Sequence, residues 1–281
     1  MGSRRPLDVI ILAAGKGVRM RTPGAKVLQS ICGKTLVRHV IDAARALKPA
    51  RIVVVVGHEA DRVRYELADQ KVVFVDQGDP QGTGHAVLQA APLYRRGERD
   101  VLVLCGDVPL VTPAVLRKLR DRHRRSGSDV TMLSFAPDDP ARYGRVIRDA
   151  GGNVSAIREW KDCTTAERRI TEVNSGIYLF KSKPLFAALP RVGNENRSGE
   201  FYLTDVPGLI LDGGGRVTAV MAPDADEVRG VNSLMELAEA ARVLVGKHDF
   251  SSFRNSGSVD TDPVKTLTRL DIAREGEYLA L

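Results

Sequence analysis

Apolar residues along the chain fall into short continuous runs, separated by stretches in which they return at helical spacing. Short apolar runs are typical of buried strands, and here they predict strands at residues 9–12, 51–56, 72–75 and 101–104. Between these runs, apolar residues at helical spacing predict helices at residues 36–47, 61–67 and 85–93. Strands that alternate with crossover helices predict a parallel, doubly wound α/β sheet.

Beyond Asp107 the pattern changes, because strand-like runs follow one another with fewer helices between them. These runs lie at residues 130–135, 144–147, 154–159, 176–180 and 216–220. We expect an added mixed region that forms the second half of a cleft at the carboxyl ends of the strands. A helix follows at 233–245, with Asn232 or Ser233 as its cap. The predicted fold is a Rossmann-like doubly wound mixed sheet with a C-terminal helix and a short appended tail.

Composition indicates a soluble globular protein, since 43% of the 281 residues are hydrophobic and 27% are charged. No apolar run is long enough to span a bilayer, and residues 9–14 are too short for a signal peptide. Cys32, Cys105 and Cys163 are widely scattered and lack the spacing of a zinc site. Because unpaired thiols fit a reducing compartment, we expect a cytoplasmic protein.

The net charge of +7 allows two kinds of anionic partner, RNA or a highly charged nucleotide or sugar phosphate. The basic clusters at Arg95-Arg96 and at residues 117–125 lie among helix-like residues. We interpret them as solvated helix faces, so the charge alone does not choose between the partners.

A glycine-rich turn with two cations follows the first predicted strand. It covers residues 12–20 (Leu-Ala-Ala-Gly-Lys-Gly-Val-Arg-Met), and Lys26 lies just beyond it. Glycines allow backbone N–H groups to close on phosphate oxygens, while cations offset the phosphate charge. The dinucleotide-binding pattern would need glycine in place of Met20, and a Walker loop ending at Thr35 would need it in place of Leu28. We interpret the segment as a phosphate-binding turn, with an ordinary strand-to-helix turn as the alternative.

Two further segments follow predicted strands. Gln77 precedes residues 81–86 (Gln-Gly-Thr-Gly-His-Ala), where small residues allow a flat base or sugar to lie against a helix N-terminus. Asp107 ends the next strand, and a carboxylate beside bound phosphates is a suitable Mg²⁺ ligand. The alternatives are a plain helix N-terminus for the first segment and a helix-capping aspartate for the second.

Together these segments resemble the sugar-phosphate nucleotidylyltransferases, and most closely the uridylyltransferase domain of the bacterial bifunctional N-acetylglucosamine-1-phosphate uridylyltransferases. The resemblance runs from about residue 8 to residue 245 and depends on the order and separation of several motifs. Its further motifs are Tyr143-Gly144-Arg145, Glu159, Asn174 before Ser175-Gly176, residues 199–205 (Gly-Glu-Phe-Tyr-Leu-Thr-Asp), and Gly230-Val231-Asn232. It implies the fold of the nucleotide-diphospho-sugar transferases.

The resemblance also implies a role for each matching residue. The nucleotide would be bound by Leu12, Ala13, Ala14, Gly15, Gln77, Gly82 and Thr83. The catalytic residues that hold the triphosphate and the departing pyrophosphate would be Arg19 and Lys26. The amino sugar would be bound by Gly144, Glu159 and Asn174. The implied cofactor is Mg²⁺, with Asp107 and Asn232 as its ligands.

In the implied reaction, a phosphate oxygen of N-acetylglucosamine-1-phosphate attacks the α-phosphorus of UTP, so that pyrophosphate leaves UTP and UDP-N-acetylglucosamine forms. A sugar phosphate has a second pKa of about 6 and needs no general base, so catalysis depends on positioning and charge neutralisation. One alternative is a related enzyme for another sugar phosphate or nucleotide. Others are an RNA-binding protein that uses its basic surface and tail, and an inactive fold with a structural role.

Three positions depart from the family pattern. Val18 stands where the family usually has a hydroxyl residue, Ala25 replaces the usual proline before Lys26, and Pro80 occupies a common glutamine position. We expect Ala25 to loosen its loop. Because the main ligands are present, we expect activity to survive.

The chain departs further after residue 245, where the family continues into a β-helix acetyltransferase domain with hexapeptide repeats. Such repeats are absent from this sequence, so we expect neither acetyl transfer nor the trimer that the domain builds. Residues 246–281 instead resemble a piece of a type A tRNA pseudouridine synthase, around the segment 248–253 (His-Asp-Phe-Ser-Ser-Phe). The catalytic aspartate of such synthases has no counterpart here, so we do not expect a nucleic-acid partner.

The expected organisation has three parts. Residues 1–228 form the nucleotidylyltransferase domain, residues 229–245 form a linker helix, and residues 246–281 form a short tail that we interpret as a fusion fragment.

Overall fold

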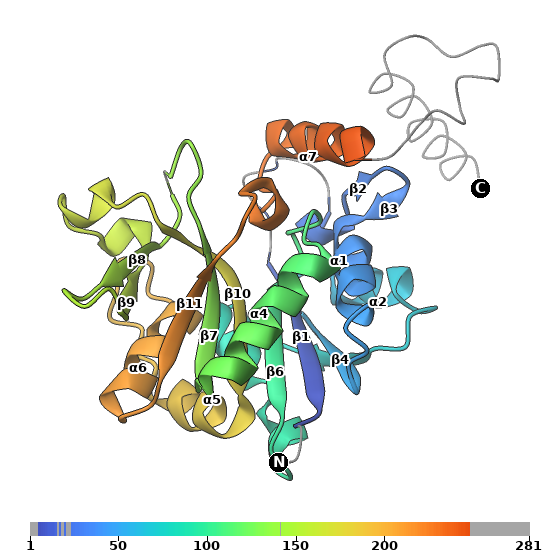
Figure 1. Ribbon diagram of the computed structural model, residues 1–281. Helices are drawn as coiled ribbons and strands as arrows, with labels where there is room; N and C mark the ends of the chain where they lie inside the picture. The colour runs from blue at the N-terminus through green and yellow to red at the C-terminus, as the bar shows by residue number, and fades with distance from the viewer. Residues whose placement is uncertain (1–4, 16, 18–19, 21–23, 141, 248–281) are drawn as a thin grey trace, which may run out of the picture.

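A nine-stranded mixed sheet forms the centre of the computed structural model, which describes residues 5–247 except 16, 18–19, 21–23 and 141 (Figure 1). The parallel half consists of β1 (Leu7–Ala13), β4 (Arg51–Val56), β5 (Val73–Asp76) and β6 (Asp100–Cys105). The other half consists of β7 (Val130–Phe135), β8 (Arg145–Arg148), β9 (Val154–Arg158), β10 (Val173–Lys181) and β11 (Val217–Met221). The short strands β2 (Ser30–Ile31) and β3 (Lys34–Thr35) pair separately.

The strand order β11-β7-β10-β6-β1-β4-β5 confirms the predicted mixed sheet. Strand β10 lies between β6 and β7 and runs antiparallel to both, whereas β11 is parallel to β7. Strands β8 and β9 form a hairpin that joins the sheet beside β10. The predicted strands at 51–56 and 130–135 have the observed bounds.

Helices cover both faces of the sheet, as a doubly wound fold requires. One face packs against α1 (Leu36–Arg45), α2 (Ala60–Glu66) and α4 (Pro113–Ser126). The other packs against α3 (Thr83–Leu88), α5 (Ser182–Ala188) and α6 (Val206–Asp212). Along β1, Val9 and Ile11 belong to the first core and Ile10 to the second, because successive strand side chains point to opposite faces. This two-sided burial explains the continuous apolar runs.

Two predicted elements differ from the structure by more than two residues at one end, whereas the others agree within two. The predicted helix 85–93 is instead α3 followed by a 3₁₀ turn at Ala91–Tyr94. Pro92 explains the break, because it lacks the N–H that a continuing helix would need. The predicted strand 176–180 begins earlier, at Val173.

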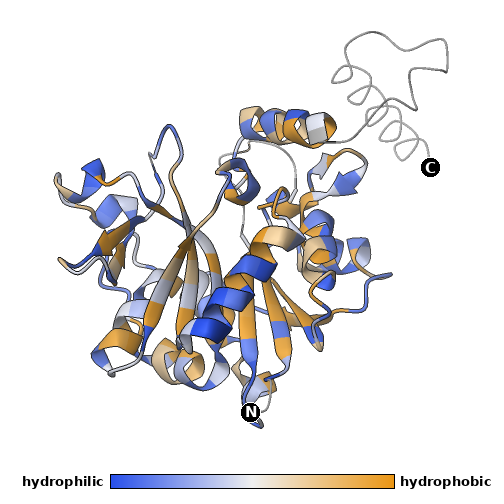
Figure 2. Cartoon of the chain, in the orientation of Figure 1, coloured by the Kyte–Doolittle hydropathy of each residue, from blue (hydrophilic) through white to orange (hydrophobic). Residues whose placement is uncertain are grey.

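Figure 2 shows hydrophobic residues gathered in the strands and a hydrophilic stretch along α4. On α4, Arg117, Arg122 and Arg125 are exposed, which agrees with a solvated helix face. In the part of the chain that the structure describes, none of the helices has the length and apolar character to cross a membrane.

Candidate active site

Three predicted site residues from distant parts of the chain meet beyond the carboxyl end of β6. The Lys26 ammonium forms an ion pair with the Asp107 carboxylate and donates to Asn232 Oδ1 at 2.8 Å. The side chains of Lys26 and Asp107 are 14% and 17% exposed, so little water separates the charges. The Asp107 carboxylate and the Asn232 amide oxygen therefore both contact the same position, which the Lys26 ammonium occupies.

Asp107 is positioned by the contact between two strand ends. The N–H of Gly106 donates to the carbonyl of Leu12 at 2.9 Å, which holds the segment after β6 against the end of β1. A Cβ on Gly106 would lie 2.9 Å from that same carbonyl oxygen, so the approach requires glycine. The carbonyl of Asp107 accepts from Val231 N–H at 2.8 Å, which brings in the segment that carries Asn232.

The start of α7 (Leu234–Lys247) fixes Asn232. The N–H of Glu236 donates to Ser233 Oγ at 3.2 Å, and the Glu236 carboxylate accepts from the N–H of Asn232. This reciprocal arrangement resembles a capping box, so Ser233 caps the helix. The Asn232 side chain is thereby left for Lys26 and for the carbonyl of Gly230.

Lys26 begins a 3₁₀ turn, η2 (Lys26–Leu28), between two buried neighbours. Ala25 is 0% and Val27 3% exposed. The glycine-rich turn lies against this segment, because a Cβ on Gly17 would come within 2.5 Å of Lys26 Cβ. Arg19, the other predicted catalytic residue, lies outside the described residues.

The donor set at Lys26 fits Mg²⁺. This hard ion prefers oxygen ligands and usually binds through one or two protein groups, with water and phosphate oxygens completing its shell. Asp107 and Asn232 offer a carboxylate and an amide oxygen that already share one cation. Among the described residues, no group of three or more His, Cys, Asp and Glu could hold a metal ion. The protein can thus supply two ligands here.

The residues predicted to bind the nucleotide lie at neighbouring strand ends. Ala13 and Ala14 are buried, and the chain reaches the surface at Gly15. Gln77 follows β5, and its Nε2 donates to the carbonyl of Gly82 at 3.0 Å. The Gln77 amide therefore shapes the turn at Gly82, in addition to the base contact expected of it.

Packing against residues 200–203 explains the small residues of the segment 81–86. A Cβ on Gly82, which has φ +111°, would lie 2.5 Å from the carbonyl oxygen of Phe201. That oxygen also accepts from Gly84 N–H at 2.8 Å, and Thr83 Oγ accepts from Leu203 N–H at 3.0 Å. The two segments therefore form one rigid border, a role that the sequence did not indicate for Phe201.

The three predicted sugar-binding residues also come together. The N–H of Asn174 donates to the carbonyl of Gly144 at 2.8 Å, and a Cβ on Gly144 would lie 3.5 Å from Glu159 Oε1. Glu159 accepts a hydrogen bond from Thr204 Oγ at 3.1 Å. Burial raises the pKa of Glu159 above its usual value, against the opposing effect of Thr204.

Cys105 lies between the predicted sugar-binding residues and Asp107. A Cβ on Gly176, two residues after Asn174, would lie 3.0 Å from Cys105 Sγ. Burial, with the charge of Asp107 second, raises the pKa of the Cys105 thiol to about 12. The thiol therefore stays neutral and serves as packing between the two groups.

Arg145 holds the loop before Gly144, a role that the sequence did not reveal. The side chain is 1% exposed and donates to the carbonyls of Pro140 at 2.7 Å and Tyr143 at 2.6 Å. Its guanidinium lies 4.7 Å from the ring centre of Trp160, a cation–π contact.

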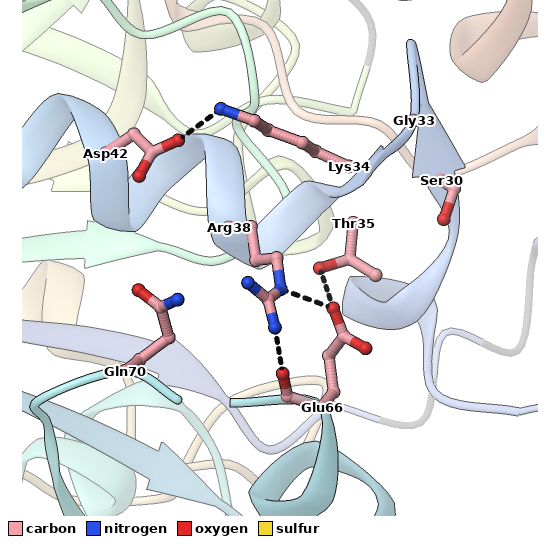
Figure 3. A pocket seen from close by; sticks show the side chains of 8 residues that line it. All are labelled: Ser30, Gly33, Lys34, Thr35, Arg38, Asp42, Glu66 and Gln70. Carbon is pink, nitrogen blue, oxygen red and sulfur yellow. Dashed lines mark hydrogen bonds and ion pairs between the residues drawn. The ribbon is translucent and has the colours of Figure 1, made fainter. Parts of the chain in front are cut away.

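A separate surface cavity of about 500 Å³ lies beside the β2–β3 hairpin and α1 (Figure 3). None of the predicted site residues lines it. Its cations pair with neighbouring acids, Lys34 with Asp42 at 2.8 Å and Arg38 with Glu66 at 2.6 Å. Those ion pairs leave no unbalanced charge that would attract phosphate there.

Comparison with known proteins identifies the family and the fold. A family model described as the MobA-like NTP transferase domain matches residues 9–200. The chain belongs to the MobA-like NTP transferase family. Among solved structures of the same fold, UDP-glucose pyrophosphorylase complexed with UDP-glucose superposes with a TM-score of 0.68 at 17% identity, over 86% of this chain and 100% of that one.

Curated relatives of this family member are named bifunctional protein GlmU. The protein from Lactobacillus delbrueckii subsp. bulgaricus is 43% identical over 264 residues, which cover 94% of this chain and 57% of the relative. The protein from Desulfotalea psychrophila is 41% identical over 244 residues, which cover 87% of this chain and 72% of the relative. The chain thus spans little more than half the length of the Lactobacillus relative.

Proposed function

We propose that this nucleotidyltransferase transfers UMP from UTP to N-acetylglucosamine-1-phosphate, which gives UDP-N-acetylglucosamine and pyrophosphate. The observation that carries the proposal is the meeting of Lys26, Asp107 and Asn232 beside the strand ends that hold the nucleotide and sugar residues. The identity of 43% with a protein named GlmU supports the choice of nucleotide and sugar.

Each predicted residue keeps its proposed role. Leu12 to Gly15, Gln77, Gly82 and Thr83 bind the uridine, and Gly144, Glu159 and Asn174 bind the amino sugar. Arg19 and Lys26 hold the phosphates that leave. The proposal places the catalytic domain at residues 1–228, the linker helix at 229–245 and the tail at 246–281. Because Asn232 belongs to the linker, the domain and its linker act together. Scattered cysteines favour a cytoplasmic location.

The chemistry requires charge neutralisation more than proton transfer. An oxygen of the sugar phosphate forms a bond to the α-phosphorus of UTP, and the bond to the bridging oxygen breaks as pyrophosphate leaves with its electron pair. When bound by Asp107 and Asn232, Mg²⁺ supplies positive charge to the phosphates. Lys26 reaches the same point and is suited to the charge that develops on pyrophosphate.

Pyrophosphate release from UTP, measured with and without N-acetylglucosamine-1-phosphate, tests the proposal. We expect Asp107→Ala to lower turnover by about a hundredfold or more, because it removes an electrostatic contact of the transition state. Asp42→Ala is the matched control, since Asp42 pairs with Lys34 on the surface. Full turnover of Asp107→Ala would overturn the metal assignment. A panel of sugar phosphates and nucleotides separates this reaction from that of a related transferase.

A further inference from the structure

We propose that Glu59 is a positioning residue for the reaction, which holds Lys26 in the site through the backbone N–H of Ala25. The inference rests on the proposed function, because Lys26 contributes only if the site binds a nucleotide triphosphate. It adds a residue that lies outside every motif of the glycine-rich turn.

The contact between Glu59 and Ala25 joins segments 34 residues apart in the chain. The N–H of Ala25 donates to the Glu59 carboxylate, and Ala25 itself is 0% exposed. A buried N–H that loses its partner destabilises the local conformation, so this hydrogen bond fixes the residue directly before Lys26. Ala25, which stands at the position of the family's usual proline, thus has a backbone N–H that Glu59 binds.

Glu59 is itself fixed on both sides. Its Oε1 accepts from Arg62 at 2.9 Å, and its backbone precedes α2 in the left-handed region with φ +53°. This region is uncommon for a residue with a side chain and persists where its surroundings favour it. The carboxylate therefore keeps one orientation, toward Ala25.

Gly24 gives a second, independent indication that this ion pair belongs to the loop. The residue has φ +94°, and a Cβ there would lie 2.8 Å from Arg62 Nη1 and 3.2 Å from Glu59 Oε2. The Glu59–Arg62 pair thus lies directly against the backbone of Gly24. Two consecutive residues before Lys26 are shaped by the same two side chains.

The consequence for Lys26 follows from its own backbone. Leu28 N–H donates to the carbonyl of Ala25 at 2.9 Å, so Ala25 begins the turn from which the Lys26 side chain extends toward Asp107. Without the Glu59 contact, Ala25 and the turn can shift, and the ammonium spends less time at the phosphate position. The Lys26 side chain remains chemically intact, so the loss is smaller than that in Lys26→Ala.

A second ion pair on α2 provides a matched control. Asp61 and Arg64 have the same spacing as Glu59 and Arg62 and lie 3.3 Å apart, but Asp61 is fully exposed. Arg64 also pairs with Asp76, the last residue of β5. Removing Asp61 therefore changes a similar pair without touching Gly24 or Ala25.

The first experiment compares kcat/KM for UTP among these variants. We expect Glu59→Ala to lower it about tenfold, and Asp61→Ala to stay within about twofold of the wild type. Glu59→Gln keeps an oxygen acceptor for Ala25 and should lose about threefold. In a Lys26→Ala background, Glu59→Ala should cause no further loss, whereas a general destabilisation would lower both backgrounds equally.

Ala25→Pro gives the decisive second measurement. Ala25 already has φ −64°, which proline adopts, and proline has no N–H that needs Glu59. We expect Glu59→Ala to have little effect in the Ala25→Pro background. An equal loss with and without the Ala25→Pro substitution, or equal kinetics of Glu59→Ala and Asp61→Ala, would overturn the proposal. Folding of each variant is checked by its thermal melt.

Failure of the proposed function has a different signature. The wild type would then turn over no sugar phosphate, while calorimetry could still measure binding of UTP with Mg²⁺. The dissociation constant for UTP, measured for the same variants, then decides the role of Glu59. We expect it to rise where kcat/KM was expected to fall, and by similar factors.

Discussion

Glu159 is subject to two opposing requirements. The proposed contact with sugar hydroxyls favours the ionised carboxylate, which offers more acceptor sites, whereas burial, the main cause of the raised pKa of Glu159, disfavours that form. Thr204 donates the hydrogen bond that offsets part of this effect. At this residue, the proposed sugar contact would come at the expense of the stability of the free protein.

Glu159→Gln should therefore stabilise the protein at neutral pH. The folded-state pKa is raised, so the unfavourable effect of the carboxylate is absent below its usual pKa of 4.5 and grows as pH rises through the folded value. We expect the melting temperature at pH 7.5 to rise by about 2 °C, with no change at pH 4. The KM for the sugar phosphate should rise about tenfold.

Glu167→Gln is the control for that measurement. The N–H of Thr164 is the main cause of the lowered pKa of Glu167, so its carboxylate stabilises the fold above pH 4.5. The variant should melt at a lower temperature than the wild type at pH 7.5. A lower melting temperature for Glu159→Gln as well would contradict the assigned burial effect.

The meeting of site residues was predictable where motifs carried them, while their roles stay predictions. Lys26, Asp107 and Asn232 follow from motif order, and the structure brings them together. Glu59 and Arg145 act through backbone groups of other loops, and such contacts leave no pattern in the sequence. Sequence reasoning therefore found the groups expected to touch substrates and missed those that position them.

At the scale of elements, α4 shows how a buried polar contact fixes a helix on the sheet. His123 Nδ1 lies 2.8 Å from Thr131 Oγ on β7, and the His123 side chain is 2% exposed. Burial is the main cause of a pKa lowered to about 4. The imidazole is therefore neutral in the folded protein at physiological pH.

The lowered pKa makes stability depend on pH through α4. The unfolded state binds a proton near pH 6.5 and the folded state only near pH 4, so stability present above pH 6.5 is lost as pH falls between these values. The loss reaches up to roughly 3 kcal/mol. Urea unfolding at pH 7.5 and pH 5 measures it.

His123→Asn removes the titration while an amide atom takes the place of Nδ1. The variant should be less stable than the wild type at pH 7.5, because the smaller side chain leaves a cavity. The difference in unfolding free energy between the variant and the wild type should be smaller at pH 5. A constant difference at both values would show that His123 does not carry the pH dependence.

Element bounds were predictable where apolar residues are continuous. Strand β4, with five consecutive apolar residues after Arg51, matches its prediction, but in β10 Asn174 and Ser175 follow the first residue, Val173, and interrupt the apolar run. Ser175 Oγ donates to the carbonyl of Leu133, so a polar residue is satisfied inside the sheet. A hydrogen bond of this kind depends on which strand lies next to β10, and the local sequence pattern does not contain that information.

For the whole molecule, the arrangement of strands decides where the site lies. The sequence predicted alternating strands and helices, but it did not predict that β10 lies between β6 and β7. That placement brings Asn174 to the edge where Asp107 follows β6. Long-range pairing of this kind depends on the summed packing of both faces and cannot be derived from local spacing.

Truncation after Lys247 tests the independence of the catalytic part. The predicted site residues all precede Ser233, so we expect kcat/KM for UTP to stay within about twofold of the full chain. Filter binding of tRNA should be micromolar and steeply salt-dependent in both proteins, as for a basic surface. Loss of turnover, or tight tRNA binding that only the full chain shows, would favour a function for residues 248–281.

The ammonium of Lys26 gives the site a counter-charge of its own. Asp107 then presents no bare negative charge to the surrounding electrolyte, and a magnesium ion that arrives alone gains little there. A triphosphate offers Lys26 a stronger anion and so releases the carboxylate. We therefore expect metal and nucleotide to enter as a pair, with weak affinity for either alone. One tethered cation would in this way couple the binding of the metal to that of the nucleotide.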